Sequence, residues 1–338
     1  VQTCALPISE ANRVPRRAPT SLAPPEDLPD RLALAGWLTS PDHPLTARVA
    51  VNRLWMVFFG RGLVATPGDL GLQGARPTHP ELLDWLARRF VDSGWDVKAL
   101  CREIVLSATY GQDSAGSSAE LDPDNILLAR GPKQRLTAEM LRDTVLFASG
   151  LLEGRIGGPP VSPYQPAGLW RESNSMSPAY RQSVGEGLYR RSLYSVVKRT
   201  APLPNMLVLD APTREASCAR REQTSTPLQG LVLLNDVQFV EASRVLAERV
   251  MGESATDAER VAAAFRWLAG REPDETEARL LEELLVSERS AFQAAPAEAA
   301  ALVATGDSDP GVADAVELAA LTAVVQVVLN LDAMVNKR

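Results

Sequence analysis

From residue 31 onward, the apolar residues of this chain recur every three or four positions over most of its length. One such stripe covers 82–90, after a Thr78-His79-Pro80 start with Glu81 in the first turn, and another covers 97–108. Residues at this spacing share one face of an α-helix, and that face must be buried against another element. The spacing therefore predicts a mainly α-helical, multi-helix domain.

The same periodicity predicts further helices over 137–152, 228–234, 236–251, 256–269, 274–293 and 312–335. Asp274 with Glu277 forms a capping-box pattern, which is typical of a helix start. The last helix has an apolar run of only about a dozen residues, short of the ~20 that cross a bilayer. We therefore expect a core helix there and no transmembrane segment. The run Leu193-Tyr194-Ser195-Val196-Val197 is the best strand candidate and predicts a small β element near 189–198.

The beginning of the chain differs from the rest. Residues 1–8 resemble the conceptual translation of a sequencing adapter, so we expect a metagenomic fragment that lacks its natural start and we exclude them from the fold. Residues 9–30 are rich in proline and predict an extended linker. Residues 31–338 predict a single domain, with an alternative of two helical lobes, 31–152 and 188–338, joined by a loop rich in Gly, Pro and Ser at 155–187.

Charge and cysteine content exclude several classes of function. The 338 residues carry 35 basic and 42 acidic side chains, a net charge of −7, so we expect no nucleic-acid partner. Three cysteines and two histidines cannot form a zinc knuckle or a Cys-x-x-Cys-His haem attachment. The chain also lacks the glycine motifs that bind phosphates and the His-Glu-x-x-His motif of metalloproteases. We therefore predict no metal site and no cofactor within this chain.

A first cluster of candidate binding residues lies in the segment 43–63. Asn52 falls between Leu45 and Phe59 on an otherwise apolar helical face. A buried polar side chain there must find hydrogen-bond partners. Two interpretations stay open: a polar core that fixes the helix register, or a pocket. The residues of that pocket would be Arg48, Asn52, Arg53 and Trp55, and His79 is either a ligand-binding residue or part of the next helix start.

A second cluster occupies the segment 210–229, which holds the densest set of acids, bases and hydrogen-bonding groups in the chain. Candidate catalytic residues are Asp210, Cys218, Arg221 and Glu222, and candidate binding residues are Arg214, Arg220, Thr226 and Gln229. Neighbouring arginines could lower the pKa of the Cys218 thiol, but both histidines lie far away in sequence. Residues 188–222 carry seven basic and three acidic side chains, which favours either ordinary solvated surface or an anionic ligand site.

Ordered motifs along the chain resemble those of one family. They include Pro44-Leu45-Thr46-Ala47-Arg48, Asn52-Arg53-Leu54-Trp55, Phe59-Gly60-Arg61-Gly62-Leu63, Thr78-His79-Pro80-Glu81, Gly157-Gly158-Pro159-Pro160, Arg190-Arg191-Ser192-Leu193-Tyr194, Asp210-Ala211-Pro212, Thr226-Pro227-Leu228-Gln229 and Leu233-Leu234-Asn235-Asp236. In this order they resemble the planctomycete "PSD one" family, a domain of unknown function. The resemblance runs from about Leu28 to the end of the chain.

The resemblance implies a biological setting. Members of the PSD one family resemble exported bacterial proteins. In them the domain is commonly joined to an upstream companion domain and often to a cytochrome c domain. It implies that this chain is the C-terminal domain of an extracytoplasmic protein, with haem c on the missing upstream part. The domain would bind a partner or substrate for an associated redox or degradative activity. The alternatives are an enzyme, a hydrolase or oxidoreductase with its site at 210–229, and a purely structural or interaction domain; the oligomeric state stays open.

Overall fold

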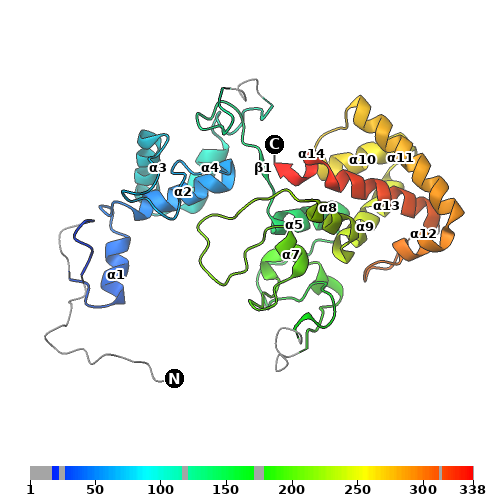
Figure 1. Ribbon diagram of the computed structural model, residues 1–338, viewed down its shortest axis with the longest axis horizontal. Coiled ribbons are helices and arrows are strands. Elements are labelled where there is room, and N and C mark those ends of the chain that lie inside the picture. The colour runs from blue at the N-terminus through cyan, green and yellow to red at the C-terminus, as the bar shows by residue number, and fades with distance from the viewer. Residues whose placement is uncertain (1–16, 23–26, 116–120, 171–178, 312–313, 338) are drawn as a thin grey trace. The chain divides into compact units, whose positions relative to one another are not determined.

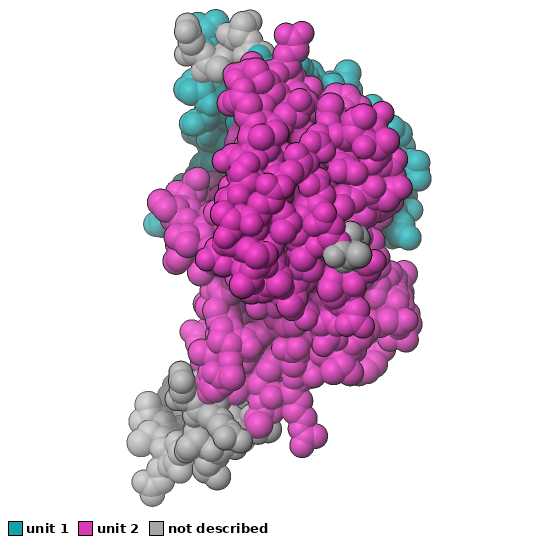
Figure 2. Space-filling view, turned by 90° about the vertical axis from the view of Figure 1, so that its right-hand side faces the viewer, with its two compact units in different colours: residues 1–133 teal, residues 134–338 magenta. Residues whose placement is uncertain are grey.

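The computed structural model describes residues 17–22, 27–115, 121–170, 179–311 and 314–337. The chain divides into two compact units, Val1–Lys133 and Gln134–Arg338, which are coloured separately in Figure 2. Helices dominate both units, so the predicted mainly α-helical class is confirmed (Figure 1). Residues 1–8 and most of the proline-rich segment 9–30 lie outside the described residues.

The first unit contains α1 (Arg31–Leu38), α2 (Thr46–Phe59), α3 (Pro80–Asp92) and α4 (Val97–Val105). The last three of these helices share one core. The apolar stripes of α2, α3 and α4 meet in a core that includes Val51, Trp55, Leu83, Phe90 and Leu100. Local sequence sets the helix ends: Pro80 opens α3 as predicted, and the carboxylate of Asp96 accepts a hydrogen bond from the Ala99 N–H at the start of α4. No residue of α1 is buried.

The second unit surrounds one buried helix. Its helices are α5 (Ala138–Ser149), α7 (Pro204–Val208), α8 (Pro227–Asn235), α9 (Val237–Glu253), α10 (Asp257–Ala269), α11 (Glu275–Ala294), α12 (Pro296–Val303), α13 (Ala315–Asn330) and α14 (Asp332–Val335), with short 3-10 helices at Gly185–Leu188 and Ser192–Tyr194. Helix α13, red in Figure 1, packs against α8, α9, α10, α11 and α12. It is the predicted core helix, and no helix within the described ranges is long and apolar enough to cross a membrane.

A small β element is present, but it joins other residues than those predicted. Strands β1 (Gln134–Arg135) and β2 (Asn336–Lys337) form an antiparallel pair that brings together the two ends of the second unit. The predicted segment 189–198 instead forms a 3-10 turn with two single bridges, Glu153 to Arg190 and Val161 to Ser195. The reason lies in tertiary contacts: Arg190 turns into the interior, and the 3-10 turn at 192–194 separates the two bridges, so the pairing does not extend into a strand.

Helix α5 belongs to the second unit, whereas the two-lobe alternative placed 137–152 in the first lobe. Its buried face packs against α9, and Arg142 within it is 1% exposed. Arg142 Nη2 donates to the Leu188 carbonyl at 2.6 Å and to Gln238 Oε1 at 2.9 Å. These long-range bonds place the boundary between units at residues 133 and 134 rather than near 152.

The predicted joining loop 155–187 also lies within the second unit, where its described residues are held by a buried arginine. Arg190 Nη2 donates to the carbonyls of Arg155 at 2.7 Å and Gly157 at 2.6 Å. Its guanidinium also lies 3.9 Å from the centre of the Tyr194 ring. The Gly157-Gly158-Pro159-Pro160 and Arg190–Tyr194 motifs, distant in sequence, are thus one structural element.

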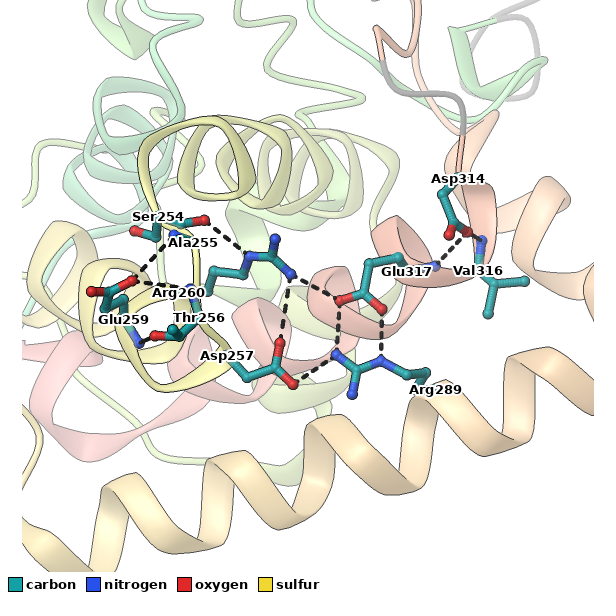
Figure 3. A network of polar contacts seen from close by, with 10 residues as sticks. All are labelled: Ser254, Ala255, Thr256, Asp257, Glu259, Arg260, Arg289, Asp314, Val316 and Glu317. Atoms are coloured by element: carbon teal, nitrogen blue, oxygen red, sulfur yellow. Dashed lines mark hydrogen bonds and ion pairs between the residues drawn. The ribbon is translucent and has the colours of Figure 1, made fainter.

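Charged residues tie together helices α10, α11 and α13 (Figure 3). Arg289 of α11 donates through Nε and Nη2 to both carboxylate oxygens of Glu317, at 2.6 and 2.8 Å, and through Nη2 to Asp257 at 2.9 Å. Arg260 pairs with Glu317 at 3.2 Å. The predicted capping box at the start of α11 is confirmed, because the Glu277 N–H donates to Asp274 at 2.8 Å and the Asp274 N–H to Glu277 at 2.9 Å.

Candidate functional site

The first unit contains a cavity of about 130 Å³ beside the end of α2. Helix α2 contributes Trp55 and Phe59, the following turn contributes Arg61, Gly62 and Leu63, and Thr78 lies before α3. The remaining wall is a loop, with Pro123, Asp124, Asn125, Ile126, Leu128, Arg130, Gly131, Pro132 and Lys133 on the lining. All of these residues belong to one compact unit, so the cavity is a property of that unit alone.

An aromatic pair forms one side of the cavity. The rings of Trp55 and Phe59 are stacked, with centroids 4.2 Å apart and planes 11° from parallel. The two side chains lie one helical turn apart on α2, which brings them onto the same face. Tyr110 meets Phe59 edge-on at 5.7 Å. The aromatic side is therefore rigid and suited to contact with an apolar or ring-shaped part of a ligand.

Asn52 does not line the cavity, but it holds in place the turn after α2 that forms part of the cavity wall. Its Nδ2 donates to the Val64 carbonyl at 3.1 Å, and its Oδ1 accepts from the Val64 N–H at 2.9 Å. Gly62 passes so close to this amide that an added Cβ would lie 2.6 Å from Asn52 Oδ1. These bonds attach the segment Gly62-Leu63-Val64 to α2. Asn52 is thus a buried polar side chain whose hydrogen bonds are satisfied within the core.

Positive charge predominates on the cavity lining. Arg61, Arg130 and Lys133 supply three cations, whereas Asp124 supplies one carboxylate. Arg130 is occupied structurally, since Nη1 donates to the Asp122 carbonyl at 2.7 Å and Nη2 to the Pro123 carbonyl at 2.6 Å. The lining therefore carries more basic than acidic side chains.

Arg61 differs from the other cations of the cavity. Its Nη1 lies 3.6 Å from Asp124 Oδ2, an ion pair beyond hydrogen-bond distance. Its Nε is buried and has no hydrogen-bond acceptor among the described residues. A buried N–H without an acceptor is costly, by about 1–3 kcal/mol. The guanidinium of Arg61 is therefore the group on this lining that is best prepared to bind an oxygen acceptor from a ligand.

The loop that closes the cavity is internally bonded and contains strained backbone. The carboxylate of Asp122 accepts from the N–H groups of Ile126 and Leu127, both at 2.8 Å, and Asn125 Nδ2 donates to the Arg130 carbonyl at 2.8 Å. Asn125 has φ +49° and Leu128 has φ +57°. A left-handed conformation costs an ordinary residue about 1–2 kcal/mol. Such strain concentrates at binding and active sites.

The predicted residues of the first cluster do not all reach this cavity. Trp55 lines it, whereas Arg48 pairs with Asp84 at 2.6 Å and also donates to the Pro44 carbonyl. Arg53 is exposed on α2, and His79 Nδ1 lies 3.0 Å from the Thr78 hydroxyl just before α3. Arg61 was missed, although its position between two glycines directly after a helix is a signal that sequence reasoning could use.

The second predicted cluster uses its central polar groups to hold its own ends together. The carboxylate of Asp210 accepts from the Thr224 N–H at 2.7 Å and from Gln229 Nε2 at 3.0 Å. Gln229 is buried, and it also donates to the Val208 carbonyl and accepts from the Thr226 N–H at 3.2 Å. The bonds among Asp210, Thr226 and Gln229 thus hold the two ends of the segment 210–229 together.

The remaining candidates of this segment are spread along its surface. Cys218 is exposed, and its thiol donates to the Arg220 carbonyl at 2.8 Å. Arg221 pairs with Glu139 of α5 at 2.7 Å, while Glu222 and Arg220 are exposed. Arg214 lies on the lining of a separate small cleft. The second unit contains no histidine, so Cys218 has no imidazole base within its own unit.

A c-type haem, which the resemblance implies for the longer protein, does not fit the residues of this chain. None of its cysteines is followed by a histidine. Cys101 is half-buried and Cys218 is exposed, and they belong to different units. Among the residues that the structure describes, no three His, Cys, Asp or Glu side chains are grouped so that they could hold a metal ion.

A family model matches most of the chain. The model of the PSD1 family, described as a protein of unknown function (DUF1553), matches residues 30–285, about three quarters of the chain. No curated protein and no solved structure matches. The matched range includes α2, the following turn, the cavity loop and the segment 210–229. The chain therefore belongs to the PSD1 (DUF1553) family.

Proposed function

We propose that this chain is a ligand-binding domain and that the first-unit cavity beside Trp55 is its binding site. The ligand is a small anion with a ring or another flat apolar part. The observation that carries the proposal is the guanidinium of Arg61, which lines the cavity with a buried Nε–H that has no acceptor among the described residues.

The energetics favour an anion over a neutral ligand. A carboxylate or phosphate oxygen would satisfy the Arg61 Nε–H, and a hydrogen bond to a charged group contributes about 1.5–3 kcal/mol. Loss of this bond corresponds to about a tenfold to hundredfold change in affinity.

The size of the cavity limits the ligand. A cavity of about 150 Å³ holds one benzene molecule. At about 130 Å³, the space beside Trp55 and Phe59 suits a single ring. The ring would pack against the aromatic pair while the anionic group faces Arg61.

The wider setting is part of the same proposal. We infer an extracytoplasmic bacterial protein of planctomycete type, in which this chain is the C-terminal domain. An upstream companion domain and a cytochrome c domain would be its partners, with haem c carried upstream. The family match supports the domain assignment, and the cavity supports a binding role. That role would serve an associated redox or degradative activity.

Binding of three probes to the whole chain tests the proposal. Benzoate and phenyl phosphate present a ring with an anion, and benzyl alcohol presents the ring alone. We expect both anions to bind in isothermal titration calorimetry and benzyl alcohol to bind more weakly. Arg61→Gln should weaken the anions by about tenfold or more, whereas Arg53→Gln, an exposed change on α2, should leave affinity unchanged. Equal affinities for wild type and Arg61→Gln would exclude this site.

A further inference from the structure

A second, smaller cleft of about 40 Å³ lies entirely within the second unit. Leu203, Met206 and Leu207 line it from the start of α7 and the helix itself, and Val197 lines it from the segment before. Leu203 and Met206 are almost fully buried. The interior of this cleft is therefore mainly apolar and suited to an aliphatic group.

Two polar side chains on the lining have hydrogen-bonding capacity left for a ligand. The hydroxyl of Ser195 is buried and has no partner among the described residues. Arg214 is exposed, lines the cleft, and makes no ion pair within the part of the chain that the structure describes. The Ser195 hydroxyl can donate a hydrogen bond to a ligand, and Arg214 supplies a positive charge.

The backbone that carries Arg214 is strained. Asp210 has φ +65° and Arg214 has φ +61°, so two residues other than glycine adopt the left-handed conformation within five positions. Asp210 is held there by its bonds to Thr224 and Gln229. Strain of this kind persists only where surrounding contacts impose it, and it is frequent at ligand sites.

The charge balance at the cleft favours an anion. Glu139 also lines it, but Arg221 neutralises that carboxylate through a contact of 2.7 Å. Burial opposes ionisation of Glu139, yet the hydrogen bonds from Arg221, from the backbone and from Thr137 lower its pKa below the ordinary value. Arg214 is therefore the uncompensated charge on this lining.

We propose that this cleft binds a branched aliphatic carboxylate, with the aliphatic end among Leu203, Met206 and Leu207 and the carboxylate on Arg214. A buried site needs about 10–15 Å³ for each water-sized group, so 40 Å³ holds about three such groups, the size of an isopropyl end. The carboxylate belongs either to a free short-chain acid or to the C-terminus of a peptide that ends in leucine. The site lies in the other unit and does not depend on the Arg61 cavity.

Methionine methyl NMR of the whole chain tests this site locally. The chain has six methionines, and Met206→Leu assigns the Met206 signal. The probes are 4-methylpentanoate, its neutral amide, and the peptide acetyl-Gly-Gly-Leu with a free or an amidated C-terminus. We expect both carboxylates to shift the Met206 methyl signal, and both amides to need about two- to fivefold higher concentrations for the same shift. Tighter binding of the peptide would identify the ligand carboxylate as a peptide C-terminus. Tighter binding of 4-methylpentanoate would identify the ligand as a small free acid.

Matched variants separate a site from an ordinary basic surface. Arg214→Gln should weaken 4-methylpentanoate about two- to fivefold, the range for an exposed charge pair. Ser195→Ala should weaken it about two- to tenfold through loss of one hydrogen bond. Arg220→Gln, an exposed change on the same segment that lies off the lining, should have no effect. Equal shifts from acid and amide, or an unchanged affinity in Arg214→Gln, would overturn the proposal.

Discussion

Asn52 and Val64 are joined by a reciprocal pair of hydrogen bonds, from Nδ2 to the carbonyl at 3.1 Å and from the N–H to Oδ1 at 2.9 Å. The side chain of one helical residue thus serves both backbone groups of a residue twelve positions later. This amide fixes the turn that carries Arg61 and Gly62, so the geometry of the cavity depends on a residue that does not line it.

Replacement of Asn52 by alanine should therefore destabilise the first unit. Two buried backbone groups of Val64 would lose their partners, at about 1–3 kcal/mol each. We expect the free energy of unfolding of the first unit to fall by about 2–4 kcal/mol in urea titrations followed by tryptophan fluorescence. Arg53→Ala, on the exposed side of the same helix, should change it by less than about 0.5 kcal/mol. Similar stabilities for the two variants would contradict a structural role for the pair.

Gly306 is required by a buried carboxylate in the second unit. Glu241 is fully buried, and its Oε1 accepts from the Tyr189 hydroxyl at 2.7 Å and the N–H groups of Asp307 and Ser308 at 2.8 and 2.9 Å. Gly306 has φ +101°, and an added Cβ would lie 2.4 Å from Glu241 Cδ.

Gly306→Ala should therefore cost about 2–5 kcal/mol, the sum of left-handed strain and overpacking. Chemical denaturation followed by circular dichroism measures this loss. Gly311→Ala is the matched control, because nothing lies within 4 Å of its added Cβ. If the two alanine variants had the same midpoint, the close contact with Glu241 would be absent in solution.

Tyrosine ionisation should unfold the second unit in alkali. Burial raises the pKa of Tyr180 to about 12, and burial together with the neighbouring Glu241 also raises the pKa values of Tyr164 and Tyr189. The folded chain then keeps phenolic protons that the unfolded chain loses near pH 10, so stability falls as the pH rises from about 10 to 12. An ultraviolet phenolate titration should show late-titrating groups, with the step near 12 absent in Tyr180→Phe. Ionisation of all five tyrosines in one step while the chain stays folded would refute this.

The ion pair of Arg289 and Glu317 should contribute measurably to stability (Figure 3). Its two hydrogen bonds are parallel, both side chains are mostly buried, and the bonds to Glu317 raise the pKa of Arg289. A double-mutant cycle with Arg289→Met and Glu317→Gln should give a coupling of about 1–2 kcal/mol. The exposed pair of Arg279 and Glu283 should give only about 0.3–0.5 kcal/mol in the same experiment. Equal couplings would show that burial adds nothing.

Local rules account for most of what could be predicted from the sequence. Helix periodicity and the capping box of Asp274 and Glu277 depend on residues within a few positions of each other, and both were confirmed. Helix α12 was missed because its stretch 296–303 is apolar or alanine on nearly every side, without a clear stripe. The final helix was expected to run to 335, but it breaks at Leu331 between α13 and α14.

Long-range contacts determine the features that the sequence pattern does not predict. The segment 193–197 has strand-like composition, but the burial of Arg190 and the bonds it makes to 155–157 decide its conformation. The cavity is only partly predictable, since the sequence pattern points to Trp55 but not to Arg61. Its far wall, residues 123–133, comes from a loop that has no periodicity and meets α2 only in the folded unit.

Arg61 is the residue that we propose to bind an anion in the first-unit cavity. The most direct measurement is the NMR signal of the Arg61 Nε–H in ¹⁵N-labelled chain, assigned with Arg61→Lys, during titration with phenyl phosphate. We predict a large, saturable shift of this signal, together with slower exchange of its proton with water, and no such change with benzyl alcohol. An Arg61 signal that stays in place while phenyl phosphate binds elsewhere, or does not bind, would contradict the claim.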